Sequence, residues 1–143
     1  MRNMVLLIDT NVVLDVLQKR GILFDPSCRI LELCANRQVQ GYIAFHSISN
    51  LWYILRKSDD GTKREKLRDI CNILTVCSVG HNDVVCAIEN GSFKDLEDCL
   101  QDKCAQAVQA DYIITRNLPD FSHSCVKAIT PEGFLELCNE TFE

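Results

Sequence analysis

Five short apolar segments, separated by longer stretches with helical patterning, constrain the fold of this chain most strongly. Each segment is too short and too apolar for a meander of antiparallel strands. Such segments are typical of a parallel sheet that is covered by helices on both faces. The pattern therefore predicts an α/β fold, a three-layer α/β/α sandwich with a central, mainly parallel sheet. The predicted strands are Met4–Ile8, Tyr42–Phe45, Thr75–Val79, Tyr112–Thr115 and Val126–Ile129.

Residues that start and stop helices divide the sequence between these strands. Asp25 and Pro26 are expected to begin one helix, as its cap and its first residue. Ser47 or Ser49 is expected to open the next, and Thr130 to cap the last. The predicted helices cover Asn11–Lys19, 25 to about 36, Ser47–Lys57, Thr62–Leu74, Asn82–Glu89, Lys94–Gln109 and 131–138.

Length and composition indicate one compact domain. The 143 residues, 47% of them hydrophobic, contain no linker or repeat, so we expect a single domain over residues 1–143. No apolar run approaches the roughly 20 residues needed to cross a bilayer, and no signal-peptide pattern is present, which favours a cytoplasmic protein without membrane contact. Nine cysteines without a CxxC pair favour small buried hydrophobic residues over disulfides or zinc ligands.

Charge bears on nucleic-acid binding in two ways. The net charge of -5 argues against strong non-specific binding through bulk charge. Six of the fifteen basic residues nevertheless fall between positions 56 and 68, which offers a local basic patch. The alternative is a solvated helix face, which acidic residues at 59, 60 and 65 within the same run favour.

Acidic and amide side chains stand where two strands of the predicted sheet end. Asp9 directly follows the first strand, and Asn117 and Asp120 follow the fourth. Because the carboxyl ends of parallel strands meet at one edge of the sheet, these side chains should share that edge. A further acid, Asp98, lies at the start of a helix beside its apolar face. Converging carboxylates repel one another unless a cation joins them, and hard oxygen ligands suit Mg²⁺ or Mn²⁺.

Each of these polar groups also has a structural explanation. Asp9, Thr10 or Asn11 can cap the following helix. The acids that precede Asp98, at positions 95 and 97, are favoured at any helix N-terminus by the helix dipole. The polar residues at 117 and 120 can shape the turn around Pro119. A second acid near the first strand, at position 15, can be a hydrogen-bond acceptor in the core or a group behind the site.

Four segments together carry a resemblance to a known family. LLIDTNVVLDVL, SISNLWYILRK, KDLEDCLQDKCAQA and ADYIITRNLPDF, in this order, resemble the PIN domain family, most closely its bacterial toxin-like (VapC-type) branch. The resemblance implies an endoribonuclease of the toxin–antitoxin type, which hydrolyses RNA with a metal-bound water. It implies Mg²⁺ or Mn²⁺ held by Asp9, Asp98 and Asp120. Asn117 stands where many relatives have an aspartate, and Thr115 matches the hydroxyl residue that usually precedes it.

The sequence departs from the family pattern at Asn50, where a glutamate is expected. An amide binds a divalent cation more weakly than a carboxylate does, and it cannot accept a proton as a general base. Asn50 and Asn117 are therefore expected to orient water or substrate. Arg56 and Lys57, at the end of the same helix, are expected to contact RNA.

Three functions remain open from the sequence. The first is the ribonuclease, with RNA as substrate and with an antitoxin protein and a second copy of the chain as candidate partners. The second is a catalytically weakened PIN-like module that binds RNA or protein, which Asn50 favours. The third is a phosphotransfer domain with Asp9 as acceptor, although the second aspartate expected two residues later is missing.

Overall fold

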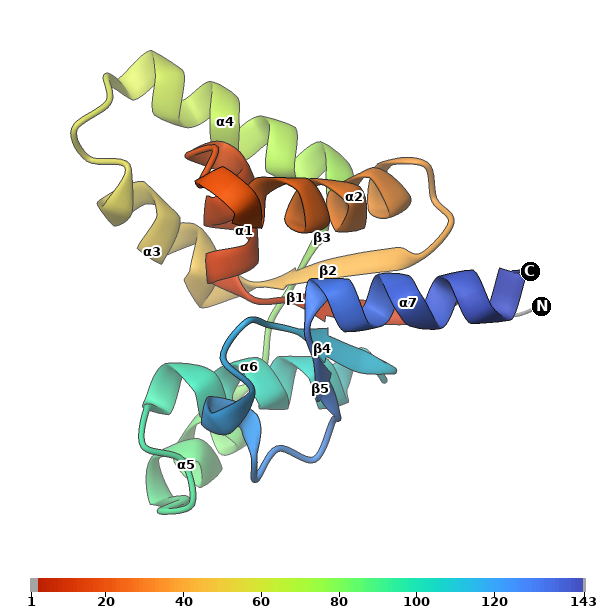
Figure 1. The fold of residues 1–143 in the computed structure, drawn as a ribbon. Coiled ribbons are helices and arrows are strands. Elements are labelled where there is room, and N and C mark those ends of the chain that lie inside the picture. Colours follow the sequence, from red (N-terminus) through yellow and green to blue (C-terminus); the bar gives the residue numbers. More distant parts are fainter. Residues whose placement is uncertain (1–2, 143) are drawn as a thin grey trace.

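The computed structural model describes residues 3–142, which form a five-stranded sheet with helices on both faces (Figure 1). The strand order is β3-β2-β1-β4-β5, and all four neighbouring pairs are parallel. This architecture confirms the predicted α/β/α sandwich. The strands are β1 (Val5–Ile8), β2 (Gln40–Ala44), β3 (Thr75–Cys77), β4 (Tyr112–Ile114) and β5 (Ala128–Ile129).

The helices form two layers. In Figure 1, α1 to α4 lie on one side of the sheet and α5 and α6 on the other, and α7 packs with the first group. Two 3₁₀ turns, η1 (Gly21–Leu23) and η2 (Leu118–Phe121), complete the connections. The helices are α1 (Thr10–Leu17), α2 (Phe24–Ala35), α3 (Phe45–Ile54), α4 (Asp60–Ile73), α5 (His81–Glu89), α6 (Leu96–Ala107) and α7 (Pro131–Phe142).

The core is divided by the sheet because successive strand residues point to opposite faces. Leu6 and Ile8 of β1 belong to the larger cluster, with α1, α2 and α7, whereas Leu7 belongs to the cluster beside α6. The backbone N–H of Asp9 donates to the Ile114 carbonyl at 2.9 Å and so continues the ladder past β1. Asp9 thereby stands at the carboxyl edge of the sheet, two residues after Leu7 and on the side of α6.

Two predictions of the residue that opens a helix are wrong. Asp25 does not cap α2, because η1 leads directly into the helix and places Asp25 inside its first turn. Helix α3 begins at Phe45 rather than at Ser47 or Ser49, because β2 runs straight into it with Ala44 as the N-cap residue. The predicted cap at Thr130 is confirmed, since its hydroxyl accepts a hydrogen bond from the Gly133 N–H at 3.0 Å.

The cysteines only partly follow the prediction. All nine are free thiols, and Cys34, Cys77, Cys99 and Cys104 are buried as expected. Those at 71, 86 and 125 are exposed, so they do not serve as core residues. Among the helices within residues 3–142, none is long and apolar enough to span a membrane.

Candidate active site

Asp9 is the centre of the polar groups at the carboxyl edge of the sheet. Its side chain is only 4% exposed. Its Oδ1 atom accepts a hydrogen bond from Gln101 Nε2 at 2.8 Å, and its Oδ2 atom accepts one from Thr115 Oγ1 at 2.9 Å. Asp9 is the N-cap residue of α1, yet within the described chain its carboxylate makes no capping hydrogen bond. The capping explanation therefore fails for Asp9.

Thr10 and Asn11 do not provide the cap either, because helix α1 already begins at Thr10. The Thr10 hydroxyl instead donates to Ser47 Oγ at 2.6 Å, in a bond that is buried between α1 and α3. This contact ties the start of α1, next to Asp9, to the start of α3. It explains why a polar serine is fully buried in α3.

Gln101 is a site residue that the sequence analysis missed. It is fully buried on α6, three residues after Asp98 and hence on the same face of the helix. Its Nε2 donates to Asp9, whereas its buried Oε1 has no hydrogen-bond partner among the described residues. The sequence did contain a signal for Gln101, because it is a polar residue one turn after Asp98 on the apolar side of the helix.

Asp98 lies in the electrostatic field of several other acids. Burial and four neighbouring carboxylates together raise the pKa of Asp98 to about 7; burial contributes most, followed by Asp9, Asp95, Asp120 and Glu97. Asp9 at the end of β1 and Asp120 in η2 are therefore close enough to Asp98 to repel its carboxylate. Asp95 is also the N-cap of α6, because its Oδ1 accepts a hydrogen bond from the Glu97 N–H at 3.0 Å.

The residues after β4 reach the same edge. Thr115 is fully buried; its hydroxyl donates to Asp9 and accepts a hydrogen bond from the Asn117 backbone N–H at 3.1 Å. Asn117 and Asp120 are exposed, the first before η2 and the second inside it. Within the described residues the Asn117 side chain makes no cap bond to η2, so its amide remains accessible to a ligand.

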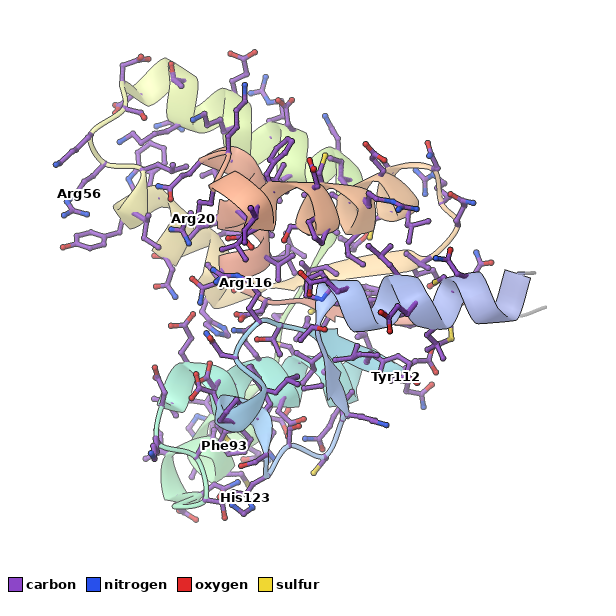
Figure 2. The ribbon with its side chains drawn as sticks, viewed as in Figure 1. Arg20, Arg56, Phe93, Tyr112, Arg116 and His123 are labelled. Atoms are coloured by element: carbon purple, nitrogen blue, oxygen red, sulfur yellow. The ribbon has the colours of Figure 1, made fainter. Side chains whose placement is uncertain are left out.

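The residues predicted on α3 are spread along the helix. Asn50 is half-buried, three residues after Ser47 and on the same face, so it lies one turn farther from Asp9 than Ser47 does. Arg56 and Lys57 lie in the turn after α3, because the helix ends at Ile54 rather than at Lys57. Figure 2 shows Arg56 at the outer end of α3, well away from Arg116.

Arg56 already has a partner within its own helix end. Its guanidinium lies over the Tyr53 ring, 4.4 Å from the centroid, and its Nη1 donates to the Tyr53 carbonyl at 3.2 Å. Both side chains are largely exposed, and so is Lys57. The structure therefore does not bring Arg56 and Lys57 to the Asp9 edge, although both remain accessible at the surface.

The acids meet some of the requirements of a divalent cation site. Across residues 3–142, no group of three or more Asp, Glu, His or Cys side chains is arranged to hold a metal. The donor chemistry nevertheless fits Mg²⁺ or Mn²⁺, which bind one or two carboxylates and keep several waters. Asp9 and Asp98 have no ion-pair partner within the described chain, and the unpaired Gln101 Oε1 adds a further oxygen beside Asp9.

Comparisons with known proteins identify relatives of this chain and solved structures that share its fold. The chain is 26% identical over 136 residues to ribonuclease VapC1 from Aquifex aeolicus (strain VF5), covering 92% of this chain and 94% of that protein. Among solved structures, VapBC2 from Rickettsia felis, bound to a DNA fragment from its promoter, superposes with a TM-score of 0.67 at 19% identity. That match covers 89% of this chain and 98% of the solved one.

A second solved structure, VapBC-1 from nontypeable Haemophilus influenzae, gives a TM-score of 0.64 at 13% identity and covers 90% of this chain and 99% of that chain. The sequence profile of the PIN domain matches residues 5–119. This segment runs from β1 into η2, and it contains Asp9, Asp98, Gln101 and Thr115. The chain therefore belongs to the PIN domain family.

Proposed function

We propose that this PIN domain is a metal-dependent endoribonuclease of the toxin–antitoxin type. The observation that carries the proposal is the buried Asp9 carboxylate, which is held by two neutral donors and lies close to a second acid, Asp98. Its similarity to a ribonuclease over nearly the whole chain supports RNA as the substrate. The fold similarity to two VapBC structures supports an antitoxin protein as partner.

In this proposal each residue of the edge has a separate task. Asp9 and Asp98 would hold Mg²⁺ or Mn²⁺, and Asp120, the third acid expected to bind the cation, would approach it from η2. When bound, the cation supplies a Lewis acid and a water of lowered pKa for attack on a phosphodiester. Gln101 and Thr115 fix both oxygens of Asp9, so that this carboxylate does not reorganise when a ligand arrives.

The two amides would orient water or substrate, and they would not transfer protons. Asn50 and Asn117 each offer a donor N–H₂ group and an acceptor oxygen, which suits the positioning of water or of a phosphate oxygen. Neither amide can accept a proton, so neither acts as a general base. Arg56 and Lys57 would contact RNA only beyond the cleavage site, because they lie past the far end of α3.

The proposal is tested by following cleavage of mixed single-stranded RNA while Mg²⁺ or Mn²⁺ is added to the metal-free full-length chain. We expect cleavage that requires the metal and stops with a chelator. Asp25→Asn is a matched control, because it removes an exposed carboxylate from α2 and should leave the rate unchanged. Absence of cleavage at every metal concentration would contradict the proposal.

The second candidate function, a weakened module that binds RNA or protein, is favoured by Asn50 alone. If Asn50 replaces a ligand that relatives retain, Asn50→Glu adds a carboxylate and should tighten Mn²⁺ binding and lower the metal concentration needed for activity. Asn50→Gln is the control for side-chain length. Isothermal titration with Mn²⁺ compares the three proteins, and weaker binding by Asn50→Glu would show that the amide belongs to the site as it is.

The phosphotransfer alternative rests on Asp9 alone. The second aspartate expected two residues after the acceptor is missing, because Asn11 occupies that position. The proposal also includes a cytoplasmic location and a single domain over residues 1–143. A second copy of the chain is a further proposed partner.

A further inference from the structure

A second buried carboxylate lies on the other face of the sheet and has a different set of partners. Asp15 of α1 is fully buried and accepts a hydrogen bond from Ser27 Oγ at 3.0 Å. Its Oδ2 lies 2.9 Å from Arg116 Nε, and its Oδ1 lies 3.7 Å from Arg20 Nη1. Two guanidinium groups thus share one carboxylate, and the group as a whole carries a charge of about +1, since arginine stays protonated.

This group lies beside the acid edge. Arg116 directly follows Thr115 at the end of β4, and Thr115 contacts Asp9 while Arg116 contacts α1. Arg20 comes three residues after the end of α1. Figure 2 shows Arg116 and Arg20 close together beside α1. Their side chains are 25% and 34% exposed, so both side chains are partly accessible to solvent.

Neutralising Asp15 does not by itself account for both arginines. One cation at 2.9 Å is enough to balance one carboxylate, and Ser27 already supplies a further hydrogen bond. Arg116 Nε lies 2.9 Å from Asp15 Oδ2 as an ion pair without hydrogen-bond geometry, and the planar guanidinium has additional N–H donors on its terminal nitrogens. A buried carboxylate that holds one side of a guanidinium by ion pairing leaves the N–H groups on its other side able to donate to two oxygens of a phosphate.

The geometry points to Arg116 and Arg20 as a subsite for an RNA phosphate, with Asp15 as the residue that positions Arg116. The inference rests on the proposed ribonuclease function. It identifies the residues that would attract RNA, whose phosphates the acids around Asp9 repel. The net charge is -5, and Asp98 lies among four other carboxylates, so RNA needs a local cation to approach Asp9. Arg116 is the basic residue next to Thr115 in the chain and provides that charge.

The test measures binding of fluorescently labelled single-stranded RNA over a series of salt concentrations. Each phosphate contact on single-stranded nucleic acid contributes about 0.7 to the slope of log K against log salt. Arg116→Gln should therefore reduce that slope by about 0.7 and weaken binding about five-fold at 0.1 M salt. Arg20→Gln should reduce the slope in the same direction. Arg37→Gln removes an exposed arginine from the turn before β2, at the opposite edge of the sheet, and should change nothing.

A double variant separates RNA binding from folding. Arg116→Gln alone leaves Asp15 with less compensation and should lower the melting temperature. The combination of Asp15→Asn with Arg116→Gln replaces the buried ion pair by a neutral pair of similar shape and should melt closer to wild type. It should still bind RNA as weakly as the single variant. Wild-type affinity and salt slope in the double variant would overturn the inference and leave Arg116 as a structural ion-pair partner.

Cleavage assays on the same proteins distinguish this inference from the function on which it rests. If wild type cleaves RNA and Arg116→Gln keeps its affinity, salt slope and KM, the subsite is rejected while the ribonuclease stands. If wild type neither binds nor cleaves RNA, both are rejected. For Arg116→Gln we expect a raised KM with a smaller change in kcat, because Arg116 would contact a phosphate other than the one at the bond that is cleaved.

Discussion

Asp9 and Asp15 are both buried carboxylates, six positions apart in the sequence, and their surroundings differ in kind. Asp15 is held by a hydroxyl group and two arginines. Asp9 is held by an amide and a hydroxyl group, and among the neighbouring acids it contributes most to the raised pKa of Asp98. Asp15 therefore has its counter-charge within the protein, whereas the described residues provide no counter-charge for Asp9.

In the function that we propose, this difference separates an acid whose charge the protein itself balances, Asp15, from an acid that is left to bind a cation, Asp9. Burial of an ion costs free energy unless a partner offsets its lost hydration, so a buried carboxylate without a counter-charge needs another stabilising interaction. For Asp9 we propose that a divalent cation from solution provides this interaction. Burial alone does not distinguish Asp9 from Asp15, because both side chains are buried. The two acids differ in the charge of the groups that surround them.

The largest effect is expected from Asp9→Asn. Loss of this ligand should lower metal-dependent RNA cleavage by at least about 100-fold, since even removal of a group behind a metal ligand costs 10–100-fold. In metal-free buffer the same variant should melt no lower than wild type, because repulsion of Asp98 disappears and the Gln101 amide, whose Oε1 has no partner among the described residues, can turn to accept a hydrogen bond from an asparagine. Cleavage at the wild-type rate would remove Asp9 from the mechanism.

Asp15→Asn should act on stability instead. It leaves two arginines without their carboxylate, and we expect a loss of about 3 kcal/mol, the lower end for a broken buried ion pair, because both arginines are partly exposed. Added Mn²⁺ should still stabilise this variant, whereas it should not stabilise Asp9→Asn. Thermal unfolding with and without Mn²⁺ checks both statements. Loss of the Mn²⁺ response in Asp15→Asn would erase the contrast between the two acids.

The smallest effect is a pH dependence of stability that comes from Asp98. Its folded-state pKa of about 7 lies above the ordinary value of 3.8, so the folded chain binds more protons than the unfolded chain between these values. Stability in metal-free buffer should therefore decline as pH rises from about 4 to about 7. Asp98→Asn should flatten this decline, and Mn²⁺ should offset it. An equal decline in Asp98→Asn would assign the effect to other groups.

Much of the fold follows from the sequence because its signals are local. Short apolar strands between helices require a parallel sheet, and the strand ends then bring Asp9 and Thr115 to one edge. The start of α3 was mispredicted because serine is a good cap in general, whereas here β2 enters the helix without a loop. The hydrogen bond from Thr10 to Ser47, which accounts for the burial of that serine, joins two elements far apart in sequence.

The missed site residues depend on contacts between distant segments. Gln101 and Asp9 are 92 positions apart, and the pairing of Arg116 with Asp15 joins the end of β4 to α1. No spacing rule connects such residues before the sheet is assembled. The polar positions themselves were visible, but their partners were not, and the partners determine whether an acid is compensated.

The most direct test of this account is the position of Mn²⁺ in crystals of the full chain soaked in that ion, located by its anomalous scattering. We predict one strong peak that is bound by carboxylate oxygens of Asp9 and Asp98, and no peak at Asp15, whose charge the arginines already balance. The absence of Mn²⁺ from Asp9 at saturating concentration, or its binding at Asp15, would contradict the account.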